Sequence, residues 1–424
     1  MTESSAMADA VPEQIPVQDW MAAAPTRRVM AALEARGGPG AARFVGGCVR
    51  NALMGRKVED VDIATPLTPE AVTDALQAAG IKAVPTGVEH GTVTAVADKT
   101  PFEITTLRRD VETDGRRAVV AFTDDWAEDA RRRDFRLNAI YADAQGRLYD
   151  PTGAGVADAR AGRIVFVGDA ETRIREDYLR ILRFFRFHAW YGRGEPDAEG
   201  LETCARLKDG VRSLSAERVA KELLKLLAAE DPRGAVGLMA GSGVLTESAP
   251  EARDLERFAV LAGADLEPAR DPVLRLAALL PDAPDVARSM AERLRLSNAQ
   301  RERLAAAVVV TDFPLSDPAA RELVYRFGRQ AAADRLLLAW AAGRGAERER
   351  LDELLALVVG PAPARPPIGG AEILAAGVPP GPLVGEVQRA LEAWWIGRDF
   401  HATKAEVREA LAAEAARVTH GGRR

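Results

Sequence analysis

The sequence is poor in several residue types, and each shortage excludes a class of protein. Its two cysteines, Cys48 and Cys204, exclude a disulfide framework and lack the spacing of a zinc site. Four histidines disfavour a metal site built on imidazole. No apolar run approaches the roughly 20 residues that a helix needs to cross a bilayer. The acidic first residues lack a basic-then-apolar leader pattern, so we expect a cytoplasmic protein without a membrane segment.

The net charge and the chain length restrict the possible classes of protein further. The formal net charge of −6 is not that of a general nucleic-acid binder, so a nucleic-acid partner would need a local basic surface. The 424 residues exceed what one hydrophobic core usually supports, and they predict several domains.

The most informative stretch is 44–65. An apolar run at 42–45 predicts a buried strand, and Gly46 and Gly47 separate it from a helical segment at 48–54. Two glycines at such a junction let the backbone approach a phosphate closely, and the free N–H groups of the helix start point at that phosphate. The pattern therefore predicts a phosphate-binding turn.

Two carboxylates follow on a predicted second strand. Asp60 and Asp62 share one face of this strand, with Val61 turned inward. Neighbouring carboxylates repel unless a hard cation such as Mg²⁺ lies between them. A Gly-Gly pair alone is usually a turn, and a lone Asp-x-Asp is usually a solvated loop edge, so the ordered combination is what predicts a metal clamp beside a phosphate cradle.

A second cluster of polar residues lies at 131–139, RRRDFRLNA. Arg132 and Arg133 can neutralise a triphosphate, since guanidinium groups match pairs of phosphate oxygens. Asp134 and Asn138 are four residues apart and share one face of a helical turn. They either hydrogen-bond a ribose or hold the arginines in place.

A third cluster lies in a segment predicted as one helix, 176–187, EDYLRILRFFRF. Asp177, Arg180 and Arg183 recur at three-residue spacing, either as salt bridges within the helix or as a base-reading surface. An Asp only accepts hydrogen bonds and an Arg only donates them. The pair therefore matches cytosine and adenine, and leaves unpaired groups against uracil and guanine.

The remaining predictions are of secondary structure. Helices are expected at 17–36, 68–80 (N-capped by Thr68) and 214–227, and strands at 82–84, 91–96, 102–107 and 164–167. Glu103, in the strand at 102–107, is either an ordinary edge residue or a third carboxylate of the site. The polar segment 109–129 is expected to be a loop. From residue 231 on, the pattern is helical with Pro/Gly breaks.

The order of these motifs resembles the superfamily of class II CCA-adding tRNA nucleotidyltransferases and bacterial poly(A) polymerases. The resemblance is specific over about 44–227 and rests on GG-x-x-R ending at Arg50, on D-x-D, on RRD-x-x-x-NA, and on E-D-x-x-R. One departure is Asn51, where the family usually has Asp.

The resemblance implies an α/β nucleotidyltransferase head, with a small mixed sheet and flanking helices, followed by an all-α neck, body and tail. The expected parts are a mostly disordered tail (1–22), a catalytic head (23–168), a nucleotide-selecting neck (169–240), and a tRNA-binding body and tail (241–424). The implied catalytic residues are Asp60, Asp62 and Glu103, with Mg²⁺ on Asp60 and Asp62. The implied nucleotide-binding residues are Gly46, Gly47, Arg50, Arg132, Arg133, Asp134, Asn138, Asp177, Arg180, Arg183 and Arg186.

The implied activity is addition of CMP, CMP and AMP from CTP and ATP to the tRNA 3′ end, with release of pyrophosphate and without a nucleic-acid template. The implied partners are the acceptor end of tRNA and the two nucleotides. Three alternatives stay open. The first is a sibling enzyme, either a poly(A) polymerase or one that adds only the terminal A. The second is a non-catalytic RNA-binding protein, and the third, for the acidic helical half alone, is a protein-interaction module.

Overall fold

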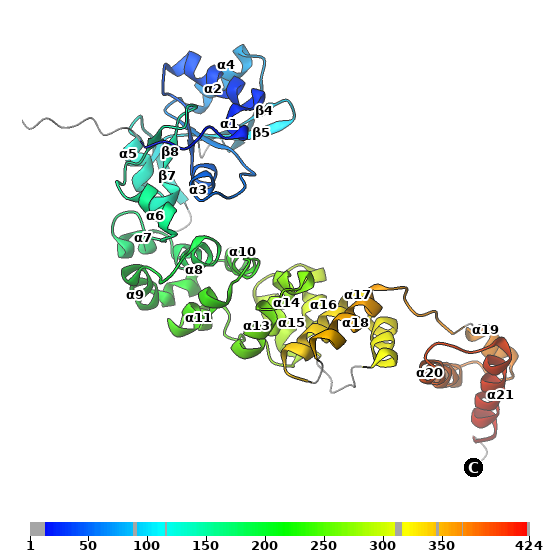
Figure 1. The fold of residues 1–424 in the computed structure, drawn as a ribbon. Helices are drawn as coiled ribbons and strands as arrows, with labels where there is room; N and C mark the ends of the chain where they lie inside the picture. Colours follow the sequence, from blue (N-terminus) through cyan, green and yellow to red (C-terminus); the bar gives the residue numbers. More distant parts are fainter. Residues whose placement is uncertain are drawn as a thin grey trace, which may run out of the picture. The chain divides into compact units, whose positions relative to one another are not determined.

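The computed structural model describes residues 13–87, 91–114, 117–309, 316–344, 347–366 and 368–421. The chain forms two compact units, Met1–Ser248 and Ala249–Arg424 (Figure 1). Residues 1–12 of the predicted tail lie outside the described residues. Among the described residues, no helix combines the length and the apolar character needed to cross a membrane.

A mixed sheet forms the head of the first unit. In the described residues it has seven strands in the order β3-β4-β5-β2-β1-β8-β9. The strands are β1 (Arg43–Val45), β2 (Asp62–Thr65), β3 (Lys82–Gly87), β4 (Thr92–Ala97), β5 (Thr100–Thr106), β8 (Tyr141–Ala142) and β9 (Leu148–Tyr149). β2 is parallel to β5, and the other neighbours are antiparallel. The predicted mixed sheet of the head is confirmed.

Helices flank this sheet, with α2 and α4 against β4 (Figure 1). The described helices of the head are α1 (Asp19–Ala22), α2 (Ala24–Gly37), α3 (Gly47–Leu53), α4 (Pro69–Ala78), α5 (Trp126–Arg131), η2 (Arg136–Asn138) and α6 (Gly155–Ala161). Thr68 caps α4 as predicted, because its hydroxyl accepts a hydrogen bond from the backbone N–H of Ala71 at 3.3 Å.

Three predicted elements of the head differ from the structure. The helix expected at 17–36 is divided at Ala23, since Pro25 has no N–H with which to continue a helix from α1. The loop expected at 109–129 instead contains an antiparallel pair, β6 (Arg108–Asp114) and β7 (Arg117–Phe122), followed by α5. The strand expected at 164–167 is reduced to a single bridge between Phe135 and Phe166.

The neck consists of helices. They are α7 (Ala170–Glu176), α8 (Leu179–Tyr191), α9 (Ala198–Arg206), η3 (Lys208–Ser213), α10 (Ala216–Leu227), α11 (Arg233–Gly241) and α12 (Val244–Ser248). The single helix predicted at 176–187 is wrong, because Asp177 is extended and its carboxylate accepts from the N–H of Leu179 at 3.1 Å, which starts a new helix. The helix predicted at 214–227 is confirmed as α10.

An aromatic cluster packs the head against the neck. Phe135 precedes η2, Phe166 lies after α6, and Phe184 and Phe187 lie on α8. The rings of Phe166 and Phe184 are stacked with centroids 5.7 Å apart, and those of Phe135 and Phe187 are 5.0 Å apart. All four side chains are buried. This burial fixes α8 against the head.

The second unit is helical in its described residues, as predicted. Its helices are α13 (Leu255–Ala262), η4 (Glu267–Arg270), α14 (Pro272–Ala278), α15 (Pro284–Arg293), α16 (Asn298–Ala307), α17 (Asp317–Ala341), α18 (Arg348–Val359), α19 (Gly370–Ala375), α20 (Pro382–Gly397) and α21 (Lys404–Gly421). Buried Arg257 is held by the carbonyl of Ala278 at 3.0 Å and the carboxylate of Asp282 at 2.6 Å.

The aromatic cluster gives a stability prediction. Phe184→Ala is expected to lower the free energy of unfolding of the first unit by about 3–5 kcal/mol, because it leaves a cavity that the neighbouring rings cannot fill. Guanidinium unfolding followed by circular dichroism measures this. Phe122→Ala removes a ring that is 43% exposed and is expected to change the free energy by no more than about 0.5 kcal/mol. Equal losses in the two variants would contradict the role of the cluster.

Candidate active site

The turn between β1 and α3 forms the centre of the site. Gly46 has φ +69°, a conformation that residues with a Cβ rarely adopt. A Cβ added to Gly46 would lie 3.6 Å from Nη1 of Arg133, and one added to Gly47 would lie 3.8 Å from Nη2 of Arg50. Two guanidinium groups therefore reach the bare backbone of this turn, an arrangement suited to a phosphate.

The two candidate metal carboxylates lie next to this turn. Strand pairing begins at Asp62, whose register partner on β5 is Glu103. Asp60 lies in the segment before β2, so the prediction that both acids lie on one strand is wrong. Pairing with β1 and β5 does not extend back to Asp60. Both carboxylates nevertheless line the same cleft, and Glu103 is exposed.

The electrostatics around Asp62 suit a cation. Burial, followed by the negative charge of Glu103, raises the pKa of Asp62 to about 6, and Asp60 adds to the rise. The guanidinium groups of Arg133 and Arg50 act in the opposite direction.

The donor set fits Mg²⁺. Within the described ranges, no three Asp, Glu, His or Cys side chains are grouped closely enough to hold a metal ion. Mg²⁺ typically binds proteins through one or two carboxylates, with water and substrate phosphate oxygens completing its shell. Asp60 and Asp62 match that requirement.

A buried carboxylate, Asp129, holds both predicted phosphate-binding arginines. Its oxygens accept from Nε of Arg132 at 2.8 Å, from Nη2 of Arg133 at 2.9 Å and from the hydroxyl of Tyr141 at 2.7 Å. Burial alone would raise the pKa of Asp129, but the charges of Arg133 and Arg132 and the hydrogen bond from Tyr141 lower it to about 2. Asp129 thus orients the guanidinium groups.

Asp134 links the head to the neck. One carboxylate oxygen accepts from the Asn138 amide at 2.9 Å, and the other accepts from Nε of Arg183 on α8 at 2.8 Å. Burial opposes ionisation, but the charge of Arg183 and the hydrogen bonds lower the pKa of Asp134 to about 2. Asp134 thus holds Arg183, whereas Asp129 holds Arg132 and Arg133, the arginines that Asp134 was predicted to hold.

Arg50 is buried and is held mainly by neutral groups. Its Nη1 donates to the amide oxygen of Asn138 at 2.6 Å, and its Nη2 donates to the hydroxyl of Tyr191 at 2.8 Å and to the amide oxygen of Asn51 at 2.9 Å. The guanidinium also lies 3.9 Å from the centroid of the Tyr191 ring. Burial lowers the pKa of Arg50. These partners do not neutralise its positive charge.

The predicted base-reading pair has other partners. The second carboxylate oxygen of Asp177 accepts from Nη2 of Arg218 on α10 at 2.6 Å. Nη1 of Arg180 donates to Glu176 at 2.6 Å and to the carbonyl of Arg173 at 2.7 Å. The salt bridge that the sequence leaves open between Asp177 and Arg180 is therefore replaced by two separate pairs.

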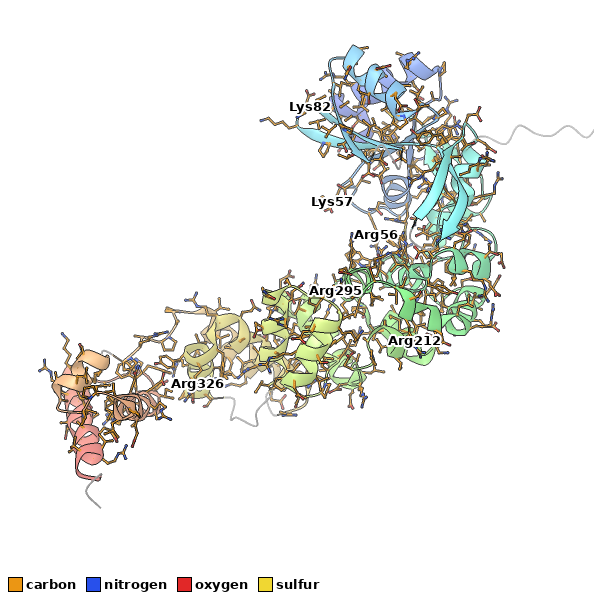
Figure 2. The ribbon with its side chains drawn as sticks, turned by 180° about the vertical axis from the view of Figure 1, so that it is seen from behind. Arg56, Lys57, Lys82, Arg212, Arg295 and Arg326 are labelled. Carbon is orange, nitrogen blue, oxygen red and sulfur yellow. The ribbon has the colours of Figure 1, made fainter. Side chains whose placement is uncertain are left out.

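A cleft of about 880 Å³ joins the acids, the glycine turn and the neck. Arg56 and Lys57 extend from the loop after α3 beside this cleft (Figure 2). Arg186, the remaining predicted residue on α8, lines the cleft and is bonded to Glu222 of α10. The residues lining it are Gly47, Arg50, Asn51, Arg56, Lys57, Glu59, Asp60, Asp62, Arg186, Trp190, Tyr191, Lys225 and Glu230.

Sequence reasoning missed several of these contacts. Asp129 precedes Arg132 and Arg133 by three and four residues, the spacing of helical ion pairs, and this signal was available. Tyr191 follows Phe187 by one helical turn and continues its face of α8. Lys225 carries no local signal, because it comes to the cleft through the packing of α10 on α8.

Fold and site together define a head of the nucleotidyltransferase type joined to a helical neck. A family model described as the poly A polymerase head domain matches residues 42–165. A second, described as a probable RNA- and SrmB-binding site of polymerase A, matches residues 195–255.

Curated relatives agree with these matches. The chain is 43% identical over 223 residues to the mitochondrial CCA tRNA nucleotidyltransferase 1 of Mus musculus, covering 51% of this chain and 50% of that protein. It is 41% identical over 185 residues to the CCA-adding enzyme of Oceanobacillus iheyensis, covering 43% and 45%. The chain thus aligns with about half the length of these relatives.

Solved structures extend the similarity over nearly the whole fold. The CCA-adding enzyme of Bacillus stearothermophilus, solved with CTP, has a TM-score of 0.75 and 25% identity, over 94% of this chain and all of that one. The Thermotoga maritima enzyme, complexed with tRNA, shares the fold with a TM-score of 0.66 at 18% identity, over 95% of this chain and 100% of that one. The chain is thus similar to CCA-adding enzymes in sequence over about half its length and in fold over nearly all of it, in agreement with the resemblance of its motifs.

The Asp129 network predicts acid sensitivity. Because the pKa of Asp129 is lower in the folded chain than in the unfolded one, its stabilisation is complete above about pH 4 and is lost as the pH falls towards 2. Asp129→Asn is expected to lose roughly 2 kcal/mol at neutral pH and to show a smaller further loss between pH 4 and 2. Unfolding titrations across this range measure the difference.

The control for this prediction is Asp124→Asn, an identical change at an exposed neighbouring position. It is expected to follow the pH profile of the parent protein. An Asp129→Asn profile parallel to that of the parent would show that the ionised carboxylate is not what stabilises the arginine pair.

Proposed function

We propose that this protein adds CMP, CMP and AMP to the 3′ end of tRNA, using CTP and ATP and releasing pyrophosphate. The observation that supports this most strongly is one cleft that combines two carboxylates, a glycine turn and the buried guanidinium of Arg50. The reaction forms a bond between the tRNA 3′ oxygen and the α-phosphorus, and breaks the bond from that phosphorus to pyrophosphate. The relatives named CCA-adding enzyme support the choice of tRNA as substrate.

In this proposal the acids hold divalent metal, as nucleotidyltransferases generally do, and Mg²⁺ is the ion. Asp60 and Asp62 are its ligands, and Glu103 lies beside them as a further negative charge. Bound there, Mg²⁺ supplies Lewis-acid activation of the attacking hydroxyl and charge neutralisation at the leaving pyrophosphate.

The triphosphate lies along the glycine turn in the same proposal. Gly46 and Gly47 let it approach the backbone, while Arg50 and Arg133 donate to its oxygens. Arg132 shares the Asp129 carboxylate with Arg133 and adds positive charge. Preorganised donors of this kind stabilise developing charge without reorganising during the reaction.

Base selection is assigned to the neck. Asp177 and Arg180 present an acceptor and a donor, which suit the Watson–Crick edges of cytosine and adenine. In the structure each is held by another residue, so reading a base requires both to exchange partners. Asn138, Asp134, Arg183 and Arg186 position α8, since they connect it to the head and to α10.

The remaining parts have proposed roles as well. We assign catalysis to the head (23–168), nucleotide selection to the neck (169–240), and tRNA binding to the body and tail (241–424), in the cytoplasm. A tRNA lacking its CCA end, incubated with each nucleotide singly and then with mixtures, separates full CCA addition from addition of A alone or of poly(A). No product with any mixture would favour a non-catalytic RNA-binding protein.

The metal assignment gives a direct prediction. Asp60→Ala and Asp62→Ala are each expected to lower the rate of CMP incorporation by more than about 100-fold, because the loss of residues that merely support a metal ligand already costs 10- to 100-fold. The fold and tRNA affinity are expected to stay close to those of the parent. Glu59→Gln, at an exposed position on the same cleft, is the matched control. Parental rates in either Asp variant would refute the assignment.

A second prediction concerns base selection. Asp177→Ala is expected to reduce the preference for CTP and ATP over UTP and GTP by at least about tenfold, because it removes the acceptor that rejects the wrong bases. Arg218→Ala is expected to reduce it less, since Arg218 only orients that carboxylate. Primer extension with each nucleotide alone measures both. If Asp177→Ala kept the parental preference for CTP and ATP, Asp177 and Arg180 could not be the residues that select the base.

A further inference from the structure

Asn51 lies in α3, directly after Arg50, and its side chain joins two parts of the site. The amide oxygen accepts from Nε of Arg50 at 3.2 Å and from Nη2 of Arg50 at 2.9 Å. The amide nitrogen donates to the backbone carbonyl of Lys57 at 2.9 Å. Because Arg50 has only donors and the Lys57 carbonyl only accepts, these neighbours fix the orientation of the amide.

The Lys57 carbonyl belongs to the loop that carries Asp60. Residues 55–61 form neither helix nor strand, and Lys57, Glu59 and Asp60 are exposed. Asn51 contacts this loop twice, since its backbone carbonyl also accepts from the N–H of Arg56 at 2.8 Å. A loop with so few buried contacts depends on such bonds for its position.

The other end of the Asn51 contact is anchored in the head and the neck. Arg50 donates to Asn138 at 2.6 Å and to the Tyr191 hydroxyl at 2.8 Å. Arg50 therefore keeps its place without Asn51, whereas the loop is bonded to Arg50 through the Asn51 amide.

We propose that Asn51 is a positioning residue, whose amide fixes the Asp60 loop to Arg50 so that the acid and the phosphate-binding guanidinium act on one nucleotide. This inference rests on the proposed function for the role of Asp60. An Asp at position 51, usual in the resembled family, could still accept from Arg50. It could not donate to Lys57, and its carboxylate would face a carbonyl oxygen.

Two variants test this in the full-length protein. Asn51→Asp keeps the acceptor for Arg50 and loses the donor to Lys57. It is expected to weaken Mn²⁺ binding, measured by electron paramagnetic resonance with CTP and without tRNA, by about 3- to 10-fold. Its KM for CTP is expected to change by less than about twofold, the effect of at most a fraction of one hydrogen bond. Amide hydrogen exchange at 55–61 is expected to become faster.

Asn51→Ala removes both interactions without adding a charge. It is expected to weaken Mn²⁺ binding as well, with a KM for CTP again close to that of the parent because Asn138 and Tyr191 still hold Arg50. This variant decides the question if the Asp variant folds poorly. Asn298→Asp makes the same chemical change at an exposed position at the start of α16 and should match the parent in all three measurements.

Parental Mn²⁺ affinity and exchange rates in both Asn51 variants would overturn the proposal. So would an Asn51→Asp variant whose KM for CTP rises while its Mn²⁺ affinity is unchanged, because the amide would then act through Arg50 alone. Metal binding and hydrogen exchange need no turnover. A parent protein that fails to extend tRNA would therefore refute the proposed function and leave this test standing.

Discussion

The buried carboxylate of Asp134 is the interaction on which the site depends. It accepts from Arg183 of α8 and from Asn138 of the head, so one charged group bonds the neck helix directly to the head. Breaking a buried pair by removing one partner typically costs 3–5 kcal/mol, because an uncompensated charge remains. The aromatic cluster supplies attraction between head and neck but little direction. The ion pair between Asp134 and Arg183 orients α8 on the head, and this orientation brings Tyr191 and Arg186 to the cleft.

The same site leaves charges of both signs unbalanced. Asp62 lies near Glu103 and Asp60, and its raised pKa reflects burial together with that negative charge. Arg50, by contrast, is buried against two amides and a hydroxyl. The guanidinium groups of Arg133 and Arg50 only partly offset the raised pKa of Asp62. Asp129, by contrast, neutralises Arg132 and Arg133 through direct ion pairs. In the proposed mechanism a magnesium–nucleotide complex, which carries a cation and an anion at a fixed separation, satisfies both Asp62 and Arg50, which a free phosphate or a free metal ion would not.

Sequence alone could predict the parts of this site that depend on local spacing. The glycine turn, the capped α4 and the closeness of Asp134 to Asn138 all follow from residues within a few positions of each other. The break before α8 did not follow, because the three-residue spacing of Asp177, Arg180 and Arg183 suits one continuous helix and only the Asp177 carboxylate interrupts it. The pairing of β6 with β7 was not predicted, because the charged residues at both ends of 109–129 indicated a loop and the strand-forming residues between them were overlooked. Contacts made through helix packing, such as that of Asp177 with Arg218, leave no local pattern.

Those packing contacts bear on how a protein without a template could read two different bases. Asp177 and Arg218 are partly exposed, with side chains 27% and 37% accessible, so the pair contributes at most about 1 kcal/mol. A mispaired polar group in a closed site costs more, about 1–3 kcal/mol for each group left unsatisfied. An incoming cytosine or adenine, in the proposed mechanism, displaces Arg218 at small cost and gives Asp177 an amino donor, whereas uracil or guanine, with donor and acceptor reversed, sets a carbonyl oxygen against the carboxylate. In the proposed mechanism the resting pair thus holds the acceptor in a single orientation without competing seriously with the correct base.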